Sequence, residues 1–278
     1  MHYEEIPTPT LCLDLGILEQ NLDRMANYCR DHGLDLRPHT KTHKTPEVAG
    51  MQMDRGAIGL TVAKVGEAEA MTAAGLDDIH VAYPVYGRDN LRRLAQLARK
   101  NRMIISLDSE TIAEAVSQAV AEIGVSVGVL VEFDGGHHRC GVQPGQACVQ
   151  LAKAIEKLPG LSFKGIMTFF GNVWGSEENR LVQTRQVSRA VEQALEAFVL
   201  EQIPVEIVSG GSTSSPLLSH LVPGLTETRP GTYVYNDLNT FYQGLCGIED
   251  YAARVVTTVV STAVPGGAII DAGSKTFS

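Results

Sequence analysis

The sequence predicts an α/β protein of the TIM (β/α)8 barrel class, and three observations support this prediction. Helical and strand-like patterns alternate about eight times along the 278 residues, a number and length typical of such a barrel. The apolar run at 125–133 is rich in valine, as expected of a strand buried on both faces of a parallel sheet. No Gly-x-Gly-x-x-Gly follows an early strand, so the competing dinucleotide-binding open sheet lacks its usual motif.

The expected elements follow one another in regular order. The first helix is expected over 16–32, where apolar residues have helical spacing up to Gly33. Further helices are expected at 47–55, 66–74, 90–100, 110–122, 146–158 and 177–201, with a short helical piece near 217–220. Strands are expected at 36–44, 57–63, 78–83, 103–107, 125–133, 161–169, 205–208 and 225–233.

The two chain ends predict a β-rich appendage beside the barrel. Residues 8–15 read as a strand, and residues 251–271 read as two more strands joined by a Val-Pro-Gly-Gly turn at 264–267. We therefore expect a barrel at 16–238 and a β-domain formed by 1–15 and 239–278. Because an isolated pair of strands is a poor stopping point for a sheet, we expect this β-domain to be incomplete, with its C-terminal part missing.

Composition narrows the classes of protein. With 44% hydrophobic and 20% charged residues, the chain is typical of globular domains. A net charge of −9 argues against a nucleic-acid partner. The N-terminus lacks the layout of a signal peptide and no apolar run is long enough to span a bilayer, so we expect a cytoplasmic protein. Five scattered cysteines without a Cys-x-x-Cys pair indicate reduced thiols rather than disulfides or structural zinc.

The basic segment 37–44, Arg-Pro-His-Thr-Lys-Thr-His-Lys, is the most informative part of the chain. In a strand, Arg37, His39, Lys41 and His43 would share one face. Crowding a lysine among other cations away from water lowers its pKa, which makes its amine nucleophilic enough to form a Schiff base. The segment therefore reads either as a site for an anionic carbonyl compound or as an exposed basic loop, and spacing alone leaves both open.

Polar clusters elsewhere favour the first reading. Lys41 ends the first expected strand, Arg139 follows the fifth, residues 209–213 follow the seventh, and residues 229–233 lie at the eighth. In a TIM barrel these strand ends meet at one rim, where function resides. The glycines at strands seven and eight leave backbone N–H groups free to bind phosphate. A phosphate cradle beside a reactive lysine and an aldehyde ligand suggests pyridoxal 5′-phosphate.

The same segments resemble the D-threonine aldolase and D-serine dehydratase family, whose barrel is similar to that of alanine racemase (fold type III of the pyridoxal-phosphate enzymes). The matching segments are 8–10, 13–14, 37–44, 65–69, 134–141, 209–213, 229–236 and 271–275, which span nearly the whole chain. The resemblance implies a pyridoxal-phosphate-dependent lyase that acts on D-β-hydroxy-α-amino acids, as an aldolase or as a dehydratase, and that forms a homodimer.

Residue roles follow from the resemblance, position by position. Lys41 matches the lysine that binds the cofactor as a Schiff base, with Lys44 as the competing candidate. Arg139 matches an arginine near the cofactor's phenolic oxygen, and Arg229 one that approaches the pyridine nitrogen. For both arginines the alternative is an ion pair at the barrel rim. The remaining expected cofactor contacts are His39, Ser209, Gly210, Gly211, Ser212, Gly231, Thr232 and Tyr233.

The chain departs from the family pattern in two places. Phe169 stands where the family often has a tyrosine, so a hydroxyl is missing. Family members also bind a divalent metal through a segment that would lie beyond Ser278, so we expect Mn or Zn only if such a segment exists and assign no metal ligand here. The adjacent His137 and His138 read as loop residues.

Two other functions remain open at this point. A non-catalytic pyridoxal-phosphate-binding (homeostasis) protein would have a similar barrel, although it would not need strands at 251–271. An amino-acid racemase would need a second base on the opposite face of the cofactor.

Overall fold

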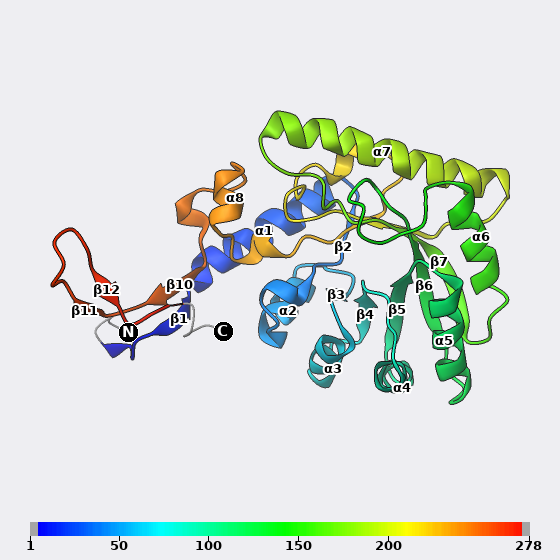
Figure 1. Ribbon diagram of the computed structural model, residues 1–278, viewed down its shortest axis with the longest axis horizontal. Coiled ribbons are helices and arrows are strands. Elements are labelled where there is room, and N and C mark those ends of the chain that lie inside the picture. The colour runs from blue at the N-terminus through cyan, green and yellow to red at the C-terminus, as the bar shows by residue number, and fades with distance from the viewer. Residues whose placement is uncertain (1–4, 274–278) are drawn as a thin grey trace.

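The structure is a computed structural model that describes residues 5–273, and it contains eight parallel strands in one sheet (Figure 1). The strands are β2 (Asp35–Leu36), β3 (Leu60–Val62), β4 (Asp78–Val81), β5 (Arg102–Leu107), β6 (Val127–Glu132), β7 (Leu161–Met167), β8 (Ile207–Gly210) and β9 (Glu227–Thr228). They pair in the order β2-β9-β8-β7-β6-β5-β4-β3. A parallel bridge between His39 and Thr61 joins β2 to β3, so the sheet closes and the predicted barrel is confirmed.

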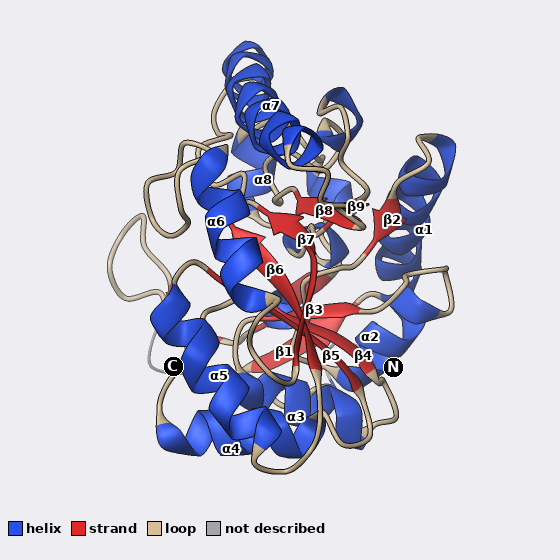
Figure 2. Cartoon of the chain, turned by 90° about the vertical axis from the view of Figure 1, so that its right-hand side faces the viewer, coloured by secondary structure: helices blue, strands red, loops and turns tan. Residues whose placement is uncertain are grey.

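Helices between successive strands cover the outside of the barrel (Figure 2). They are α1 (Leu15–Asp31), α2 (Pro46–Met53), α3 (Val65–Ala73), α4 (Arg88–Leu97), α5 (Glu110–Ala121), α6 (Gln146–Ile155) and α7 (Glu177–Leu200). Between β8 and β9 the helical piece expected near 217–220 is only the 3-10 turn Ser219–Leu221. No helix within residues 5–273 is long and apolar enough to cross a membrane.

Helix α1 shows how the sequence specifies these elements. The Asp14 side chain accepts a hydrogen bond from the Ile17 N–H and so caps the start of the helix. Leu18, Leu22 and Met25 recur on one face and are buried against the barrel. Gly33 has a φ of +64°, a conformation that glycine adopts without strain, and the chain leaves the helix there.

The strand predicted at 36–44 is wrong over most of its length. The regular strand ends at Leu36, the extended backbone reaches only His39, and Thr40–Thr42 form a 3-10 turn. Arg37 and His39 do share the interior face, but Lys41 is presented by the turn. The strand predicted at 225–233 likewise ends at Thr228, and Thr232–Val234 form a second 3-10 turn. Pro38 and Pro230 have no N–H to donate, which shortens both ladders.

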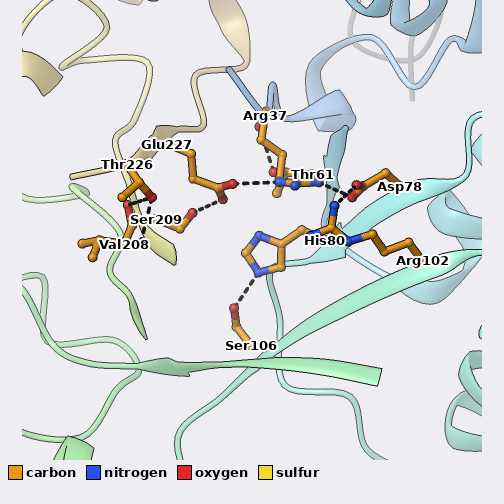
Figure 3. Close-up of polar contacts among 10 residues, drawn as sticks. All are labelled: Arg37, Thr61, Asp78, His80, Arg102, Ser106, Val208, Ser209, Thr226 and Glu227. Carbon is orange, nitrogen blue, oxygen red and sulfur yellow. Dashed lines mark hydrogen bonds and ion pairs between the residues drawn. The ribbon is translucent and has the colours of Figure 1, made fainter. Parts of the chain in front are cut away.

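The barrel interior is mostly polar. A small apolar layer of Ile104, Leu130 and Met167 lies inside, whereas the large apolar core lies between the strands and the outer helices. At the amino-terminal strand ends the Arg37 guanidinium lies between two carboxylates (Figure 3): its Nε is 2.9 Å from Glu227 Oε2 and its Nη1 is 2.5 Å from Asp78 Oδ1. The other Glu227 oxygen accepts from Ser209, 2.6 Å away.

The two chain ends form the predicted β-rich appendage, which extends from the barrel beyond α1 (Figure 1). Strand β1 (Thr10–Leu13) pairs antiparallel with β10 (Ala253–Val256), and β11 (Val259–Ser261) pairs with β12 (Ile269–Ile270). Residues 251–271 thus contain three strands rather than two. Asp271 accepts hydrogen bonds from Thr8 at 2.7 Å and Thr257 at 2.6 Å, which ties both chain ends together. Residues 274–275 of the matching segment lie outside the described residues.

Candidate active site

Lys41 lies at the carboxyl-terminal mouth of the barrel, in the 3-10 turn that follows β2. His39, the residue before the turn, caps it, because His39 Nδ1 accepts a hydrogen bond from the Lys41 N–H at 3.3 Å. Partial removal of the Lys41 ammonium from water, followed by the charges of Arg229 and Arg139, lowers its pKa, and Glu67 opposes the shift. The amine therefore has the electrostatic surroundings expected of a nucleophilic lysine.

Lys44, the competing lysine, faces elsewhere. Its φ is +51°, and its side chain is 57% exposed. Its Nζ lies 3.5 Å from Glu67 Oε1, and the other oxygen of this buried carboxylate accepts the Ala63 N–H at 2.8 Å. An exposed ammonium held by a carboxylate lacks the crowding by other cations that surrounds Lys41, so the geometry favours Lys41 over Lys44.

Both predicted arginines lie beside Lys41. Arg229 is buried, and its Nη2 donates to the Thr168 carbonyl at 3.0 Å and to Met167 Sδ at 3.3 Å. Arg139 is half-exposed and lies over the Phe169 ring, with Cζ 4.7 Å from the ring centroid. Lys41 Nζ is 5.6 Å from the same centroid, so Phe169 provides one aromatic surface for two cations.

The two glycine-bearing loops meet next to the turn of Lys41. Gly211 has a φ of +91°, and a Cβ there would clash with the Thr228 hydroxyl. A Cβ on Gly231 would lie 3.0 Å from the His39 carbonyl oxygen and 3.2 Å from Thr42 Oγ1. Among the described residues, the backbone N–H groups of Gly211 and Gly231 donate to no protein atom. These free donors suit an anion bound between the loops.

The other predicted contacts fall into two groups. His39 and Ser212 are buried near the loops and the turn, and Thr232 lies 3.5 Å from Thr42, hydroxyl to hydroxyl. Ser209 and Tyr233 point elsewhere: Ser209 Oγ donates to Glu227, and the Tyr233 hydroxyl accepts from Gln52 at 2.9 Å within the outer core. A cofactor contact through either residue would therefore be made by its backbone, and both stay predictions. Gly210 is the last residue of β8.

Sequence reasoning missed the carboxylate of this site. Glu132, the last residue of β6, is buried with 3% exposure, and its Oε1 lies 4.0 Å from Arg139 Nη2. It stands as the one charged residue in the apolar run 125–133. A carboxylate at the end of a buried parallel strand is costly to desolvate, and this was the signal that could have identified it.

Comparison with known proteins agrees with this geometry. The family model described as the alanine racemase N-terminal domain matches residues 13–239. D-threonine aldolase from an Arthrobacter species is 34% identical over 275 residues, which cover 97% of this chain and 72% of that protein. D-threo-3-hydroxyaspartate dehydratase from a Delftia species is also 34% identical, covering 98% of this chain and 73% of that protein.

Solved structures extend the likeness to the whole described fold. The crystal structure of D-threonine aldolase from Filomicrobium marinum has a TM-score of 0.93 at 33% identity and covers 97% of this chain and 74% of that one. Alanine racemase from Clostridium difficile, at 17% identity and a TM-score of 0.73 over 90% of this chain and 65% of that one, shares the fold alone. The chain thus belongs to the alanine racemase N-terminal domain family, within the fold type III group that includes D-threonine aldolase and D-threo-3-hydroxyaspartate dehydratase.

Proposed function

We propose that this protein is a pyridoxal-phosphate-dependent lyase that acts on D-β-hydroxy-α-amino acids. The observation that supports it best is the convergence, at one barrel mouth, of a lysine with a lowered pKa, two arginines and two loops with free backbone donors. Its relatives with 34% identity over nearly the whole chain are named as D-threonine aldolase, 3-hydroxy-D-aspartate aldolase and a 3-hydroxyaspartate dehydratase.

The residues present fit the cofactor. The free N–H groups of Gly211 and Gly231 would hold its phosphate, next to the turn that presents Lys41. Within residues 5–273, Arg229 Nε is buried without a hydrogen-bond partner, which leaves a donor for the pyridine nitrogen. Arg139 would approach the phenolic oxygen from the side of β6.

When bound, pyridoxal phosphate supplies an aldehyde for the substrate's amine and an electron sink for charge at its α-carbon. The protein orients this chemistry. Lys41 would provide the amine that binds the aldehyde and would afterwards hold or return a proton at Nζ, a role that its lowered pKa favours. Arg229 would hold an unprotonated ring nitrogen, since a guanidinium group donates hydrogen bonds and does not accept them. Phe169, whose ring packs edge to face on His137 with 5.2 Å between the ring centroids, covers one side of the Lys41 ammonium.

The experiment that tests the proposal is a product assay with four substrates. The purified protein, supplied with pyridoxal phosphate, is incubated with D-threonine, D-3-hydroxyaspartate, D-serine and D-alanine, each with and without a chelator. Glycine plus an aldehyde identifies an aldolase, and an oxo acid plus ammonia a dehydratase. Formation of L-alanine would identify a racemase instead, and cofactor binding without any product a carrier.

The chelator also tests a metal requirement. A variant of a D-threo-3-hydroxyaspartate dehydratase has been solved in a metal-free form. Within residues 5–273, no group of three or more His, Cys, Asp or Glu side chains is placed to hold a metal ion. A divalent metal, Mn or Zn, would polarise the substrate's β-hydroxyl and so assist either reaction. Loss of turnover with the chelator and its return with Mn or Zn supports metal dependence.

The remaining proposals concern assembly and location. We propose a cytoplasmic homodimer with a barrel at 16–238 and a β-domain formed by 1–15 and 239–278. Exposed apolar side chains on the appendage, at Val259, Val260 and Ile269, support an association surface there. Sedimentation that shows a fully active monomer would contradict the dimer.

A further inference from the structure

Glu132 is a buried carboxylate that the proposed chemistry does not use. It ends β6 two residues after Leu130 and so shares the face of that residue, which points into the barrel. Its Oε1 lies 4.0 Å from Arg139 Nη2, and among the described residues its Oε2 has no hydrogen-bond partner. Burying such a group is unfavourable unless positive charge offsets it.

Arg229 needs an anion that its direct partners do not supply. Its hydrogen bonds go to a carbonyl and a thioether, which bear no charge. Two carboxylates act on it electrostatically, Glu227 and Glu132. Glu227 is already bonded through one oxygen to Arg37 and through the other to Ser209. Glu132 is thus the carboxylate with an oxygen left for the two arginines of the site.

We propose that Glu132 is a positioning residue that holds Arg139 and Arg229 in place for the cofactor. It acts from inside the barrel, where it neutralises the repulsion between the two guanidinium groups. Without it, the half-exposed Arg139, which also contacts the Cys140 side chain, would lose its ion pair and move more freely from the Phe169 ring into solvent. This inference rests on the proposed function, since both arginines are taken to contact the cofactor.

The test uses pyridoxamine 5′-phosphate, which has no aldehyde and so cannot react with Lys41. Its dissociation constant is measured by calorimetry for the cofactor-free protein and for Glu132→Gln, which keeps the shape and removes the charge. We expect Glu132→Gln to bind about tenfold more weakly, the size of one charge-assisted contact. Glu122→Gln, an exposed carboxylate on the outer surface, is the matched control and binds as the parent does.

A double-mutant cycle separates positioning from general damage. If Glu132 acts through Arg139, then Glu132→Gln has little further effect in an Arg139→Met background. Independent, additive losses would overturn the proposal, as would unchanged binding by Glu132→Gln. If the parent protein itself binds no pyridoxamine phosphate, the proposed function fails instead. Should Glu132→Gln not fold, Glu132→Asp, which keeps the charge, serves in the same cycle and is expected to retain most of the affinity.

The pH dependence gives a second readout. The charged and titratable groups that face Glu132 are Arg139 and Cys140 on its own loop, Asp108 after β5 and Arg229 after β9. Burial raises the pKa of Glu132 against the opposing charges of Arg229 and Arg139. Affinity in the parent should fall more steeply than in Glu132→Gln as pH drops through this raised pKa, because both proteins share the titration of the ligand's phosphate. Identical profiles would contradict the inference.

Discussion

Buried charged side chains are fully paired at the amino-terminal end of the barrel and only partly paired at the carboxyl-terminal end. At the amino-terminal end, Arg37 has both neighbouring carboxylates within ion-pair distance, and Asp78 is bonded in addition to Arg102 at 2.8 Å (Figure 3). At the carboxyl-terminal end, Glu132 and Arg229 each keep a buried polar atom without a partner among residues 5–273. The ion pairs at the amino-terminal end stabilise the contacts between strands. The unpaired polar atoms at the carboxyl-terminal end are available to bind a ligand.

The largest expected effect follows from removing the amine at the ligand-binding end. Lys41→Ala should lower kcat by about 10²–10⁴-fold, the range associated with a positioned proton-transfer group. Lys44→Ala, which removes an exposed ion pair, is the matched control and should retain activity within about threefold. Steady-state kinetics with the best substrate measures both, and equal losses would show that Lys41 has no special role.

Removing Arg37 from its ion pairs at the amino-terminal end of the barrel should lower the stability of the fold rather than catalysis. Arg37→Met leaves Glu227 and the inner oxygen of Asp78 uncompensated, so the free energy of unfolding should fall by about 3–5 kcal/mol. Arg139→Met, at the other end, should change it by less than about 1 kcal/mol while weakening cofactor binding. Urea unfolding measures both variants. A stable Arg37→Met protein that no longer binds cofactor would reverse the assignment of the two ends.

Buried histidines predict how stability depends on pH. Burial lowers the pKa of His43 from 6.5 to about 4, and the pKa of His39 and of His80 also falls well below 6.5. Below pH 6.5 the unfolded chain binds protons that the folded one does not, so stability decreases as pH falls toward 4. Each such histidine contributes a slope of about 1.4 kcal/mol per pH unit. His43→Asn should reduce the slope by one histidine's share in urea unfolding at pH 7, 6 and 5; an unchanged slope would contradict a neutral His43.

The smallest expected effect concerns the aromatic surface under the two cations. Phe169→Leu removes the contact with Lys41 and Arg139 and should weaken cofactor binding by about twofold to fivefold. Phe169→Tyr keeps the ring and should bind within about twofold of the parent. A large gain with tyrosine would show that the hydroxyl expected from the family pattern matters more than the ring.

The comparison also shows what the sequence could predict. The barrel class and the order of helices and strands followed from the spacing of apolar residues, because each element buries one regular face. The convergence of Lys41, Arg139 and Arg229 followed from the rule that function gathers at strand carboxyl ends. The conformation of 37–43 did not follow: backbone pairing stops at His39, and the 3-10 turn that presents Lys41 is capped by the His39 side chain.

The pairing of charges was also beyond the sequence. Arg37 looked like part of the ligand face, yet Glu227 and Asp78, at distant positions in the chain, offset its charge at the opposite end. Glu132 and Arg139 are close in sequence, but closure of the barrel decides which arginines a buried carboxylate contacts. Long-range electrostatic partners are set by the fold, which local patterns do not encode.

One measurement tests the central claim most directly. The cofactor-free protein is mixed with pyridoxal 5′-phosphate, reduced with borohydride, digested, and mapped by mass spectrometry at the level of single residues. The arrangement at the barrel mouth predicts a single pyridoxyl group on Lys41, with Lys44 unmodified. A label on Lys44, or one distributed over surface lysines, would contradict the assignment of the active site.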